Sequence, residues 1–158
     1  MSFFEKARTF FEASGMVTLD FLACGGRPPA EAALALADVD VAGRYRVTAQ
    51  RECVVVRHVA RVCSRLPTQD GSLGTVVAEE VRDAQGPAAA GGLAFPYTLR
   101  AGQSVEDVFH VAGVDLPAQL RRYGLEGVDP RVEFFVRVVV DVQGSPFDPE
   151  FELPLRVR

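Results

Sequence analysis

The side chains able to do acid–base chemistry are few, beginning with two histidines, His58 and His110. A histidine that binds a metal or acts as a general base needs a second polar group at a defined spacing. Neither histidine lies in an H-x-H or H-E-x-x-H motif. The favoured interpretation of both is an ordinary surface or partly buried histidine.

The three cysteines, Cys24, Cys53 and Cys63, are odd in number and show no C-x-x-C spacing. This pattern predicts buried reduced thiols rather than a disulfide framework. Cys53 and His58 fall in one predicted strand, but residues five apart in a regular strand point to opposite faces. They are therefore a poor nucleophile–base pair, and buried apolar cysteine is the favoured interpretation.

Glycine pairs and acidic pairs also fail to form recognisable sites. Gly25-Gly26 and Gly91-Gly92 lack the strand–turn–helix context of a phosphate cradle. The pairs Glu79-Glu80 and Glu106-Asp107 are adjacent in sequence, and adjacent side chains on a strand diverge, so each pair is expected on a solvated face. The sequence thus predicts no catalytic residue, no metal site and no cofactor.

Arginines recur on one face of the strand predicted over residues 53–66, at Arg57, Arg61 and Arg65. Guanidinium groups suit carboxylate and phosphate, so this arginine stripe is a candidate site for an anion or an acidic partner. The arginines alternate on this face with Val55, Val59 and Cys63, and the favoured alternative is an outward face on which the arginine stems lie over these apolar neighbours.

An amphipathic helix is predicted over residues 1–14. Ser2 and Glu5 form a capping-box pair, and Gly15 ends the helix. The apolar face carries Phe3, Phe4, Phe10 and Phe11. A helix of about three turns is unstable in water unless that face is buried. The phenylalanines either dock onto their own chain or bind a second subunit, a partner protein or a membrane. Because cations are few beside them, a protein contact is favoured over a membrane contact.

The composition fits one globular domain. The chain has 158 residues, 48% apolar and 24% charged, with a net charge of -4, which argues against a nucleic-acid surface. No apolar run approaches the roughly 20 residues of a membrane span. Glu5, Lys6, Arg8 and Glu12 interrupt the N-terminal apolar stretch, so no signal peptide is predicted and a cytoplasmic location is expected.

From Met16 the hydrophobic period becomes two, which indicates strands. Strands are expected over residues 16–23, 33–41, 45–50, 53–66, 75–82, 93–99, 105–111, 132–142 and 151–157, with a short helix capped by Asp115. In the strand over 53–66, Val54, Val56, Ala60 and Val62 are expected opposite the arginines. So many short strands predict an all-β, antiparallel two-sheet sandwich over residues 15–158, with a barrel as the competing closure.

Several short segments are similar to one protein family. They are the opening Met1-Ser2-Phe3-Phe4, the first strand with its proline turn, Leu93–Leu99, and the strand Val132–Val142 followed by Phe147-Asp148-Pro149. In these segments the chain resembles the bacterial sporulation-control protein family, here as one sandwich. The resemblance implies an arrestin-like (immunoglobulin-like) fold and a non-enzymatic adaptor or regulator that acts through sheet edges and loops.

The predicted function is protein binding in the cytoplasm, as a regulatory or scaffolding module. Phe3, Phe4, Phe10 and Phe11 are the candidate partner contact, and self-association as a homodimer is an open alternative. The alternative function is a small-molecule or lipid carrier with an apolar cavity gated by residues 83–92. The third possibility is an enzyme. Its active site would have to form from residues that are distant in sequence, such as His58, His110 and Asp148.

Overall fold

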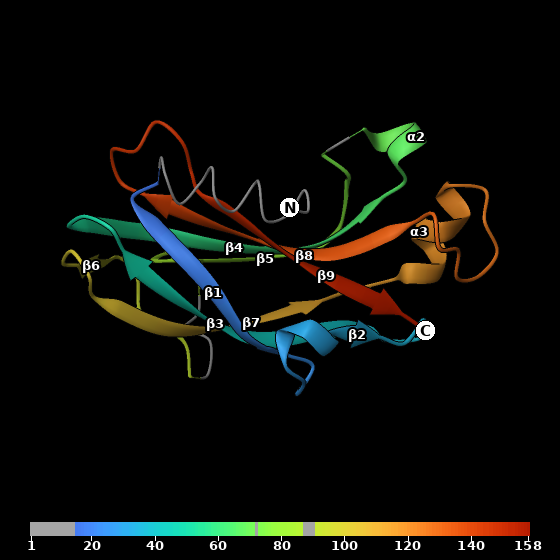
Figure 1. The fold of residues 1–158 in the computed structure, drawn as a ribbon, viewed down its shortest axis with the longest axis horizontal. Helices are drawn as coiled ribbons and strands as arrows, with labels where there is room; N and C mark the ends of the chain where they lie inside the picture. The colour runs from blue at the N-terminus through green and yellow to red at the C-terminus, as the bar shows by residue number, and fades with distance from the viewer. Residues whose placement is uncertain (1–14, 72, 87–90) are drawn as a thin grey trace.

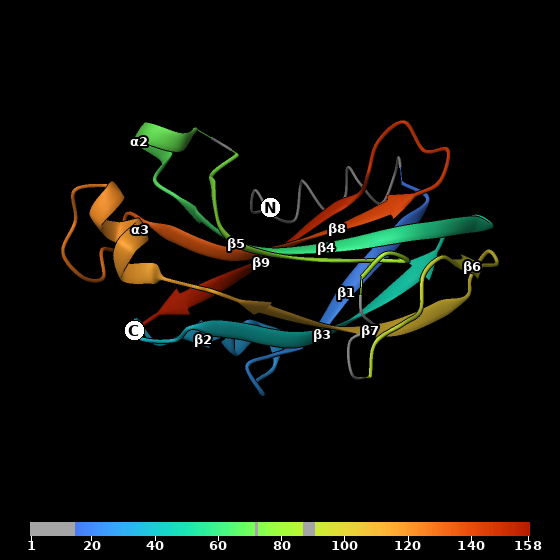
Figure 2. The same cartoon turned by 180° about the vertical axis from the view of Figure 1, so that it is seen from behind.

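The computed structural model describes residues 15–71, 73–86 and 91–158. The helix predicted over residues 1–14, with its four phenylalanines, lies outside the described residues. The rest of the chain folds as two sheets packed face to face (Figures 1 and 2).

The smaller sheet has three strands in the order β1 (Val17–Cys24), β3 (Asp40–Ala49) and β7 (Ser104–Ala112). The larger sheet runs β2 (Ala33–Leu34), β9 (Glu150–Val157), β8 (Glu133–Val142), β4 (Cys53–Arg65) and β5 (Thr75–Asp83), and β6 (Tyr97–Leu99) also pairs with β4. Every pairing between these strands is antiparallel except the short parallel contact of β2 with β9. For the described residues, the predicted all-β sandwich is confirmed.

Helical segments are short: η1 (Pro29–Glu31), α2 (Pro67–Asp70) and α3 (Leu116–Arg122). The predicted cap of α3 is confirmed, because Asp115 Oδ1 accepts a 3.0 Å hydrogen bond from the Ala118 amide. Within the described part of the chain, no helix combines the length and the apolar character that crossing a membrane requires.

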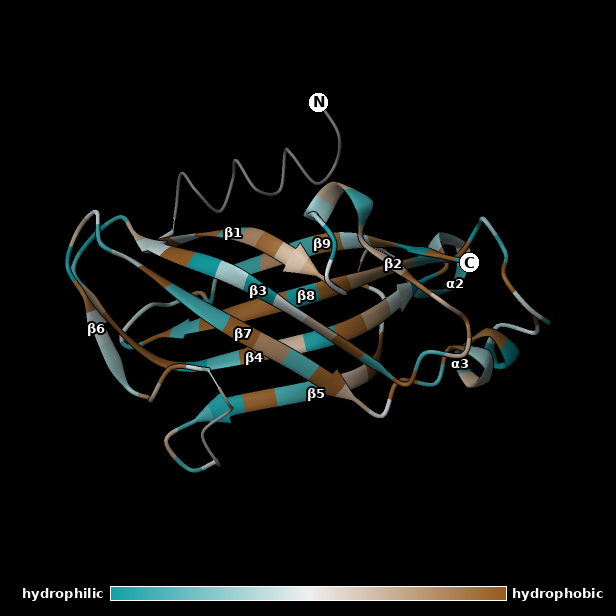
Figure 3. Ribbon diagram, turned by 90° about the horizontal axis from the view of Figure 1, so that it is seen from below, coloured by the Kyte–Doolittle hydropathy of each residue, from teal (hydrophilic) through white to brown (hydrophobic). Residues whose placement is uncertain are grey.

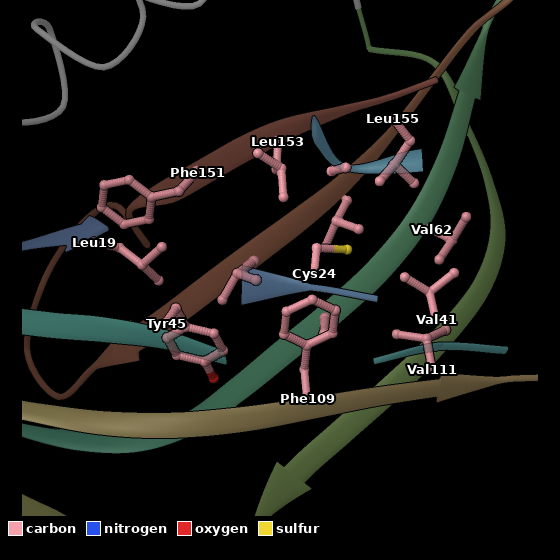
Figure 4. Close-up of a cluster of buried hydrophobic side chains, with 14 of the residues drawn as sticks. Leu19, Cys24, Val41, Tyr45, Val62, Phe109, Val111, Phe151, Leu153 and Leu155 are labelled. Atoms are coloured by element: carbon pink, nitrogen blue, oxygen red, sulfur yellow. The ribbon is translucent and has the colours of Figure 1, made fainter. Parts of the chain in front are cut away.

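The core lies between the sheets. Figure 3 shows hydrophobic and hydrophilic residues alternating along the strands, as expected where every second side chain faces the core. The predicted inner face of the strand over 132–142 is confirmed, since all six of its residues are buried: Val132, Phe134, Val136, Val138, Val140 and Val142. Side chains from β1, β3, β7 and β9 complete the cluster, among them Leu19, Val41, Tyr45, Phe109, Val111, Phe151, Leu153 and Leu155 (Figure 4).

The prediction of one strand over Ala33–Val41 is wrong. β2 ends at Leu34, and a turn follows in which Asp38 Oδ2 accepts from the Ala35 amide at 2.9 Å while the Asp38 amide donates to the Ala35 carbonyl at 3.0 Å. These hydrogen bonds to Asp38 satisfy backbone and side-chain groups within the turn, so the backbone here does not need to pair with a neighbouring strand. The turn moves the chain from the larger sheet to the smaller one, where β3 begins.

The predicted inner face of β4 is wrong at its first half because the strand contains a bulge. Val55 pairs with Val142 and Arg57 pairs with Asp141, so Val56 is an extra residue on β4. The bulge changes the phase of the alternation, so that Val55 is fully buried in the core although two-residue periodicity assigned it to the arginine face.

The strand predicted over Leu93–Leu99 is limited to Tyr97–Leu99. Before it, residues 93–96 have no regular structure, and the peptide bond between Phe95 and Pro96 is cis. This segment, residues 93–96, lies against the polar side chains described next.

Candidate functional site: an inner polar cluster and an outer arginine face

Polar side chains that no single motif marks meet between the sheets. We call them the inner polar cluster: Tyr45 on β3, His58 on β4, Arg82 on β5, Tyr97 on β6 and Asp107 on β7. The expectation that Asp107 lies on a solvated face is wrong, because it is only 1% exposed. Its neighbour Glu106 does face solvent, where it lies 3.6 Å from Arg46.

The carboxylate of Asp107 is the centre of the cluster. Its Oδ2 lies 2.7 Å from His58 Nδ1 and 2.7 Å from Arg82 Nη1. Its Oδ1 accepts from the amides of Leu93 at 3.1 Å and Val108 at 2.9 Å. Burial by itself would raise the pKa of Asp107, but the hydrogen bonds from His58 and Arg82 outweigh burial and hold the pKa below its ordinary value.

His58 is buried and has a partner at each ring nitrogen. Because Nδ1 faces the Asp107 carboxylate, we assign the proton to Nδ1, and Nε2 then accepts from the Tyr97 hydroxyl at 2.7 Å. Burial lowers the pKa of His58, and the favourable interaction with Asp107 does not reverse that shift. The ring is therefore held as a neutral, fully hydrogen-bonded group.

Two tyrosines close the cluster. Tyr45 is fully buried, and its hydroxyl lies 2.6 Å from His58 Nδ1 and donates to Asp107 Oδ2 at 3.2 Å. Burial, first, and the charge of Asp107, second, raise the pKa of both Tyr45 and Tyr97. Both phenols thus stay protonated and act as hydrogen-bond donors.

Arg82 joins three parts of the fold. From β5 it donates to the Val108 carbonyl on β7 at 2.6 Å and to the Leu93 carbonyl at 3.2 Å, while its charge pairs with Asp107. The guanidinium carbon also lies 5.5 Å from the centre of the Phe95 ring. The side chain is 6% exposed, so this is a buried ion pair with additional hydrogen bonds.

A histidine beside an aspartate has the composition of a general base, but the geometry here opposes that role. A base must place a free ring nitrogen within hydrogen-bond reach of a substrate. His58 is 2% exposed and both of its nitrogens are occupied within the protein. What the arrangement does is tie β7 and residues 93–96 to the larger sheet.

The arginine stripe lies on the outer face of the larger sheet, and each arginine faces carboxylates. Arg57 Nη2 lies 2.8 Å from Asp141, and Arg61 Nε lies 2.6 Å from Glu79. The Arg65 guanidinium lies 3.3 Å from Glu133 and 3.3 Å from Glu152. An acidic ligand on this stripe would have to replace these carboxylates.

Between the arginines lies a second set of buried apolar side chains, outside the core cluster. We call it the outer apolar patch: Val59 and Cys63 on β4, Phe135 and Val139 on β8. Val59 pairs across the sheet with Val139, and Cys63 with Phe135. Val59 is 7% exposed and Val139 is 9% exposed, whereas Cys63 and Phe135 are fully buried. Burial raises the pKa of the Cys63 thiol to about 11.

Charged groups frame this patch. The guanidinium carbons of Arg65 and Arg137 lie 4.4 and 5.2 Å from the centre of the Phe135 ring. Arg137 Nη2 donates to Glu152 Oε1 at 2.9 Å and to the Leu73 carbonyl at 2.7 Å. Two buried atoms, Arg65 Nε and Glu152 Oε2, have no hydrogen-bond partner among the described residues.

The other chemistry-bearing residues have separate partners. His110 is exposed and its Nε2 lies 2.9 Å from Asp40. The pKa of Asp148 is raised by burial and by the neighbouring charge of Asp141. Hence His58, His110 and Asp148 do not share a site.

The three cysteines are buried and free, as predicted. In residues 15–71, 73–86 and 91–158, no group of three or more histidine, cysteine, aspartate or glutamate side chains could hold a metal ion. Phe3, Phe4, Phe10 and Phe11 lie outside these ranges.

Two hollows lie near the paired ends of β2 and β9. One, of about 450 Å³, is lined by residues that include Arg27, Leu34 and Asp38. The other, of about 420 Å³, is lined by residues that include Val132 and Leu155. Neither hollow contains a residue of the inner polar cluster.

Comparison with known proteins identifies the fold. No protein-family model matches the chain, and no curated protein matches its sequence. Among solved structures, Spo0M, a sporulation control protein from Bacillus subtilis, is similar with a TM-score of 0.58 and 14% identity over 91% of this chain. The chain spans 50% of the length of that Spo0M chain.

Two further structures are less similar. The DNA glycosylase AlkC from Pseudomonas fluorescens, bound to DNA, has a TM-score of 0.40 and 13% identity over 92% of this chain and 32% of its own. The ligand-binding region of SgrA from Enterococcus faecium has a TM-score of 0.38 and 12% identity over 89% of this chain and 97% of its own. The TM-score of 0.58 to Spo0M shows that the described part of this chain is a β-sandwich with a similar fold.

Proposed function

We propose that this chain is a non-enzymatic, protein-binding module with a regulatory or scaffolding role in the cytoplasm, built on an arrestin-like sandwich. One observation carries the proposal: the His58–Asp107 pair, which could do acid–base chemistry, is sealed between the sheets and saturated with internal hydrogen bonds. A function based on surfaces is then favoured over one based on a reactive group, and the Spo0M-like fold supports a regulatory role.

The candidate contact comprises Phe3, Phe4, Phe10 and Phe11, which share one face of the predicted helix. Aromatic side chains bury a large apolar area with little loss of rotamer freedom, which makes them effective anchors in protein interfaces. Arg57, Arg61 and Arg65 are a second candidate contact, for an acidic partner that exchanges with their carboxylates.

The proposal is tested by affinity capture from the lysate of the native organism. The intact chain is compared with a variant in which the four phenylalanines are changed to serine. A matched control changes Arg8, Thr9 and Glu12, which lie on the opposite face and outside the capping box, to serine. Near-ultraviolet circular dichroism and thermal unfolding must first show that each variant is folded.

We expect a defined partner to be captured by the intact chain and by the control, but not by the phenylalanine variant. Capture of the same proteins by all three chains, or of nothing by any of them, would contradict the proposed contact. Sedimentation of the purified chain distinguishes a foreign partner from a second copy, because a homodimer forms without lysate.

The alternative function, a small-molecule or lipid carrier, requires an apolar cavity. The space between the sheets is instead occupied by packed core side chains such as Tyr45 and Phe109, whose rings stack with centres 6.1 Å apart (Figure 4). We expect native mass spectrometry of the purified chain to show the mass of the polypeptide alone. A co-purified lipid would favour the carrier.

A further inference from the structure

The four edge strands of the two described sheets differ in how they are protected against pairing with another chain. β2 has only two residues, and β5 carries charged side chains along its length. On β7, two backbone groups are bonded to side chains of β5. Short length, charge and occupied backbone groups all discourage edge-to-edge pairing. β1 has eight residues, of which Asp20 alone is charged, and β3 is its one partner in the described sheets (Figure 3).

The backbone groups on the open side of β1 follow from its pairing with β3. The Gln50 amide donates to the Met16 carbonyl at 2.8 Å, so Met16 and every second residue after it bond to β3. The intervening residues of an antiparallel strand point their amides and carbonyls the other way. The backbone groups of Val17, Leu19 and Phe21 therefore point away from β3, and no residue within the described ranges bonds to them.

We propose that the open edge of β1 pairs antiparallel with β1 of a second copy, about a two-fold axis that passes at Leu19. In this register Leu19 faces Leu19 of the second copy and Val17 faces Phe21, so the open amides and carbonyls of all three residues are hydrogen-bonded. The smaller sheets of the two copies then form one continuous sheet. Such an interface uses the same surface on both copies and closes as a dimer. It is separate from the phenylalanine contact proposed above.

The side chains of β1 select a second copy in this register. On the outer face of the sheet, Asp20 lies opposite Thr18, whose hydroxyl can donate to the carboxylate. A shift of the register in one direction sets the two Asp20 side chains opposite each other, and like charges in that position are destabilising. A shift in the other direction sets Phe21 opposite Gly15, before the start of β1. On the inner face, Phe21 is only partly buried against the core, and Val17 of the second copy covers its open side.

Disulfide cross-linking of the full chain tests both the pairing and its register. In the proposed dimer, Thr18 of one copy and Asp20 of the other form a non-hydrogen-bonded pair, with Cα atoms about 4.5 Å apart, which a disulfide can span. Identical positions of the two copies lie diagonally, about 7–8 Å apart, which is too far. The variants Thr18→Cys and Asp20→Cys are therefore oxidised mildly, alone and as a mixture. Ala42→Cys, on an exposed position of β3, is the control, and the intact chain gives the background from its buried cysteines.

We expect a covalent dimer in the mixture, joined through the two introduced cysteines, and little cross-linking in either variant alone or with Ala42→Cys. Sedimentation of the intact chain should show a dimer that dissociates on dilution. Thr18→Asp sets like charges opposite each other at two places in the dimer, so we expect it to raise the dissociation constant about tenfold. Thr18→Lys should lower the dissociation constant, because lysine then faces Asp20. Ala42→Asp, which adds the same charge away from the edge, should leave it unchanged.

Two outcomes would overturn the proposal. If the intact chain is a monomer at every concentration, no second copy pairs with β1, and protection of the Leu19 and Phe21 amides from hydrogen exchange in that monomer would show that the chain itself occupies the edge. If either cysteine variant alone cross-links as efficiently as the mixture, the two-fold axis does not pass at Leu19. The variant with serine at the four phenylalanines should dimerise as the intact chain does. A failed capture experiment would therefore reject the proposed partner contact without deciding the dimer.

Discussion

Asp107 is the residue on which the inner polar cluster depends, since it neutralises Arg82 and accepts hydrogen bonds from His58 and from two backbone amides. Replacing it by asparagine preserves the shape but leaves Arg82 buried without a counter-charge. Breaking a buried pair in this way costs about 3–5 kcal/mol. We expect Asp107→Asn to lower the free energy of unfolding in urea by that amount.

The control is Asp40→Asn, which breaks the contact of another carboxylate with a histidine, His110. Both of those side chains are more than half exposed, so we expect a change within about 0.5 kcal/mol. Equal effects of the two substitutions would contradict a structural role for the buried cluster.

His58 makes stability depend on pH. Burial holds the pKa of His58 in the folded protein below its ordinary value of 6.5, so the unfolded chain binds more protons than the folded one as the pH falls through that value. The stabilisation is therefore fully present above pH 6.5 and is lost toward lower pH. Asp107 adds a second loss only below its ordinary value of 3.8.

The test is the free energy of unfolding in urea at pH 7 and at pH 5. We expect the intact chain to lose stability between these values and His58→Gln, which cannot titrate, to lose less. Parallel pH dependences of the two proteins would show that His58 is not the source.

At the scale of the elements, Gly43 sets how closely the strands of the smaller sheet can pack. A Cβ at this position of β3 would meet the Ala23 carbonyl oxygen of β1 and the Phe109 ring of β7. Overpacking of this kind costs about 1–3 kcal/mol. We expect Gly43→Ala to lower the urea midpoint accordingly. Gly86→Ala should not, since the nearest atom to a Cβ there is 3.8 Å away.

Regular elements could be predicted from the sequence because their periodicity is unbroken. The six apolar residues of the strand over 132–142 alternate without interruption, and all six are buried. In β4 the bulge at Val56 moves Cys53 and His58 to the same side of the sheet. The bulge depends on pairing with β8, far along the chain, so local alternation cannot reveal it.

The inner polar cluster could be predicted only in part. Val105, Phe109 and Val111 alternate on one face of β7, and this alternation places Asp107 among them. As an adjacent acidic pair, Glu106-Asp107 instead predicts a solvated face, which is wrong for Asp107. The convergence of His58, Arg82, Tyr97 and Asp107 comes from four strands, and strand order is a property of the whole sheet rather than of a local motif.

For the molecule as a whole, side chains rather than backbone pairing close the sandwich between β5 and β7. Glu80 accepts from the His110 amide at 3.1 Å, and Arg82 donates to the Val108 carbonyl at 2.6 Å. The two bonded groups belong to β7, an edge strand of the smaller sheet. The β5 side chains therefore occupy backbone groups that this edge would otherwise present to another chain. The two sheets are thus linked on this side by charged groups as well as by the core.

Arg82→Lys tests that link, because lysine keeps the charge but cannot reproduce the fork that reaches Val108, Leu93 and Asp107 together. We expect amide hydrogen exchange to accelerate at least about tenfold in β7 and over residues 93–99, with little change in β8, an interior strand of the larger sheet. Arg61→Lys, at the exposed pair with Glu79, should leave the exchange pattern unchanged. Uniform acceleration in all strands would mean that Arg82 supports only global stability. A loss of exchange protection confined to β7 and residues 93–99 would show that Arg82 links the two sheets.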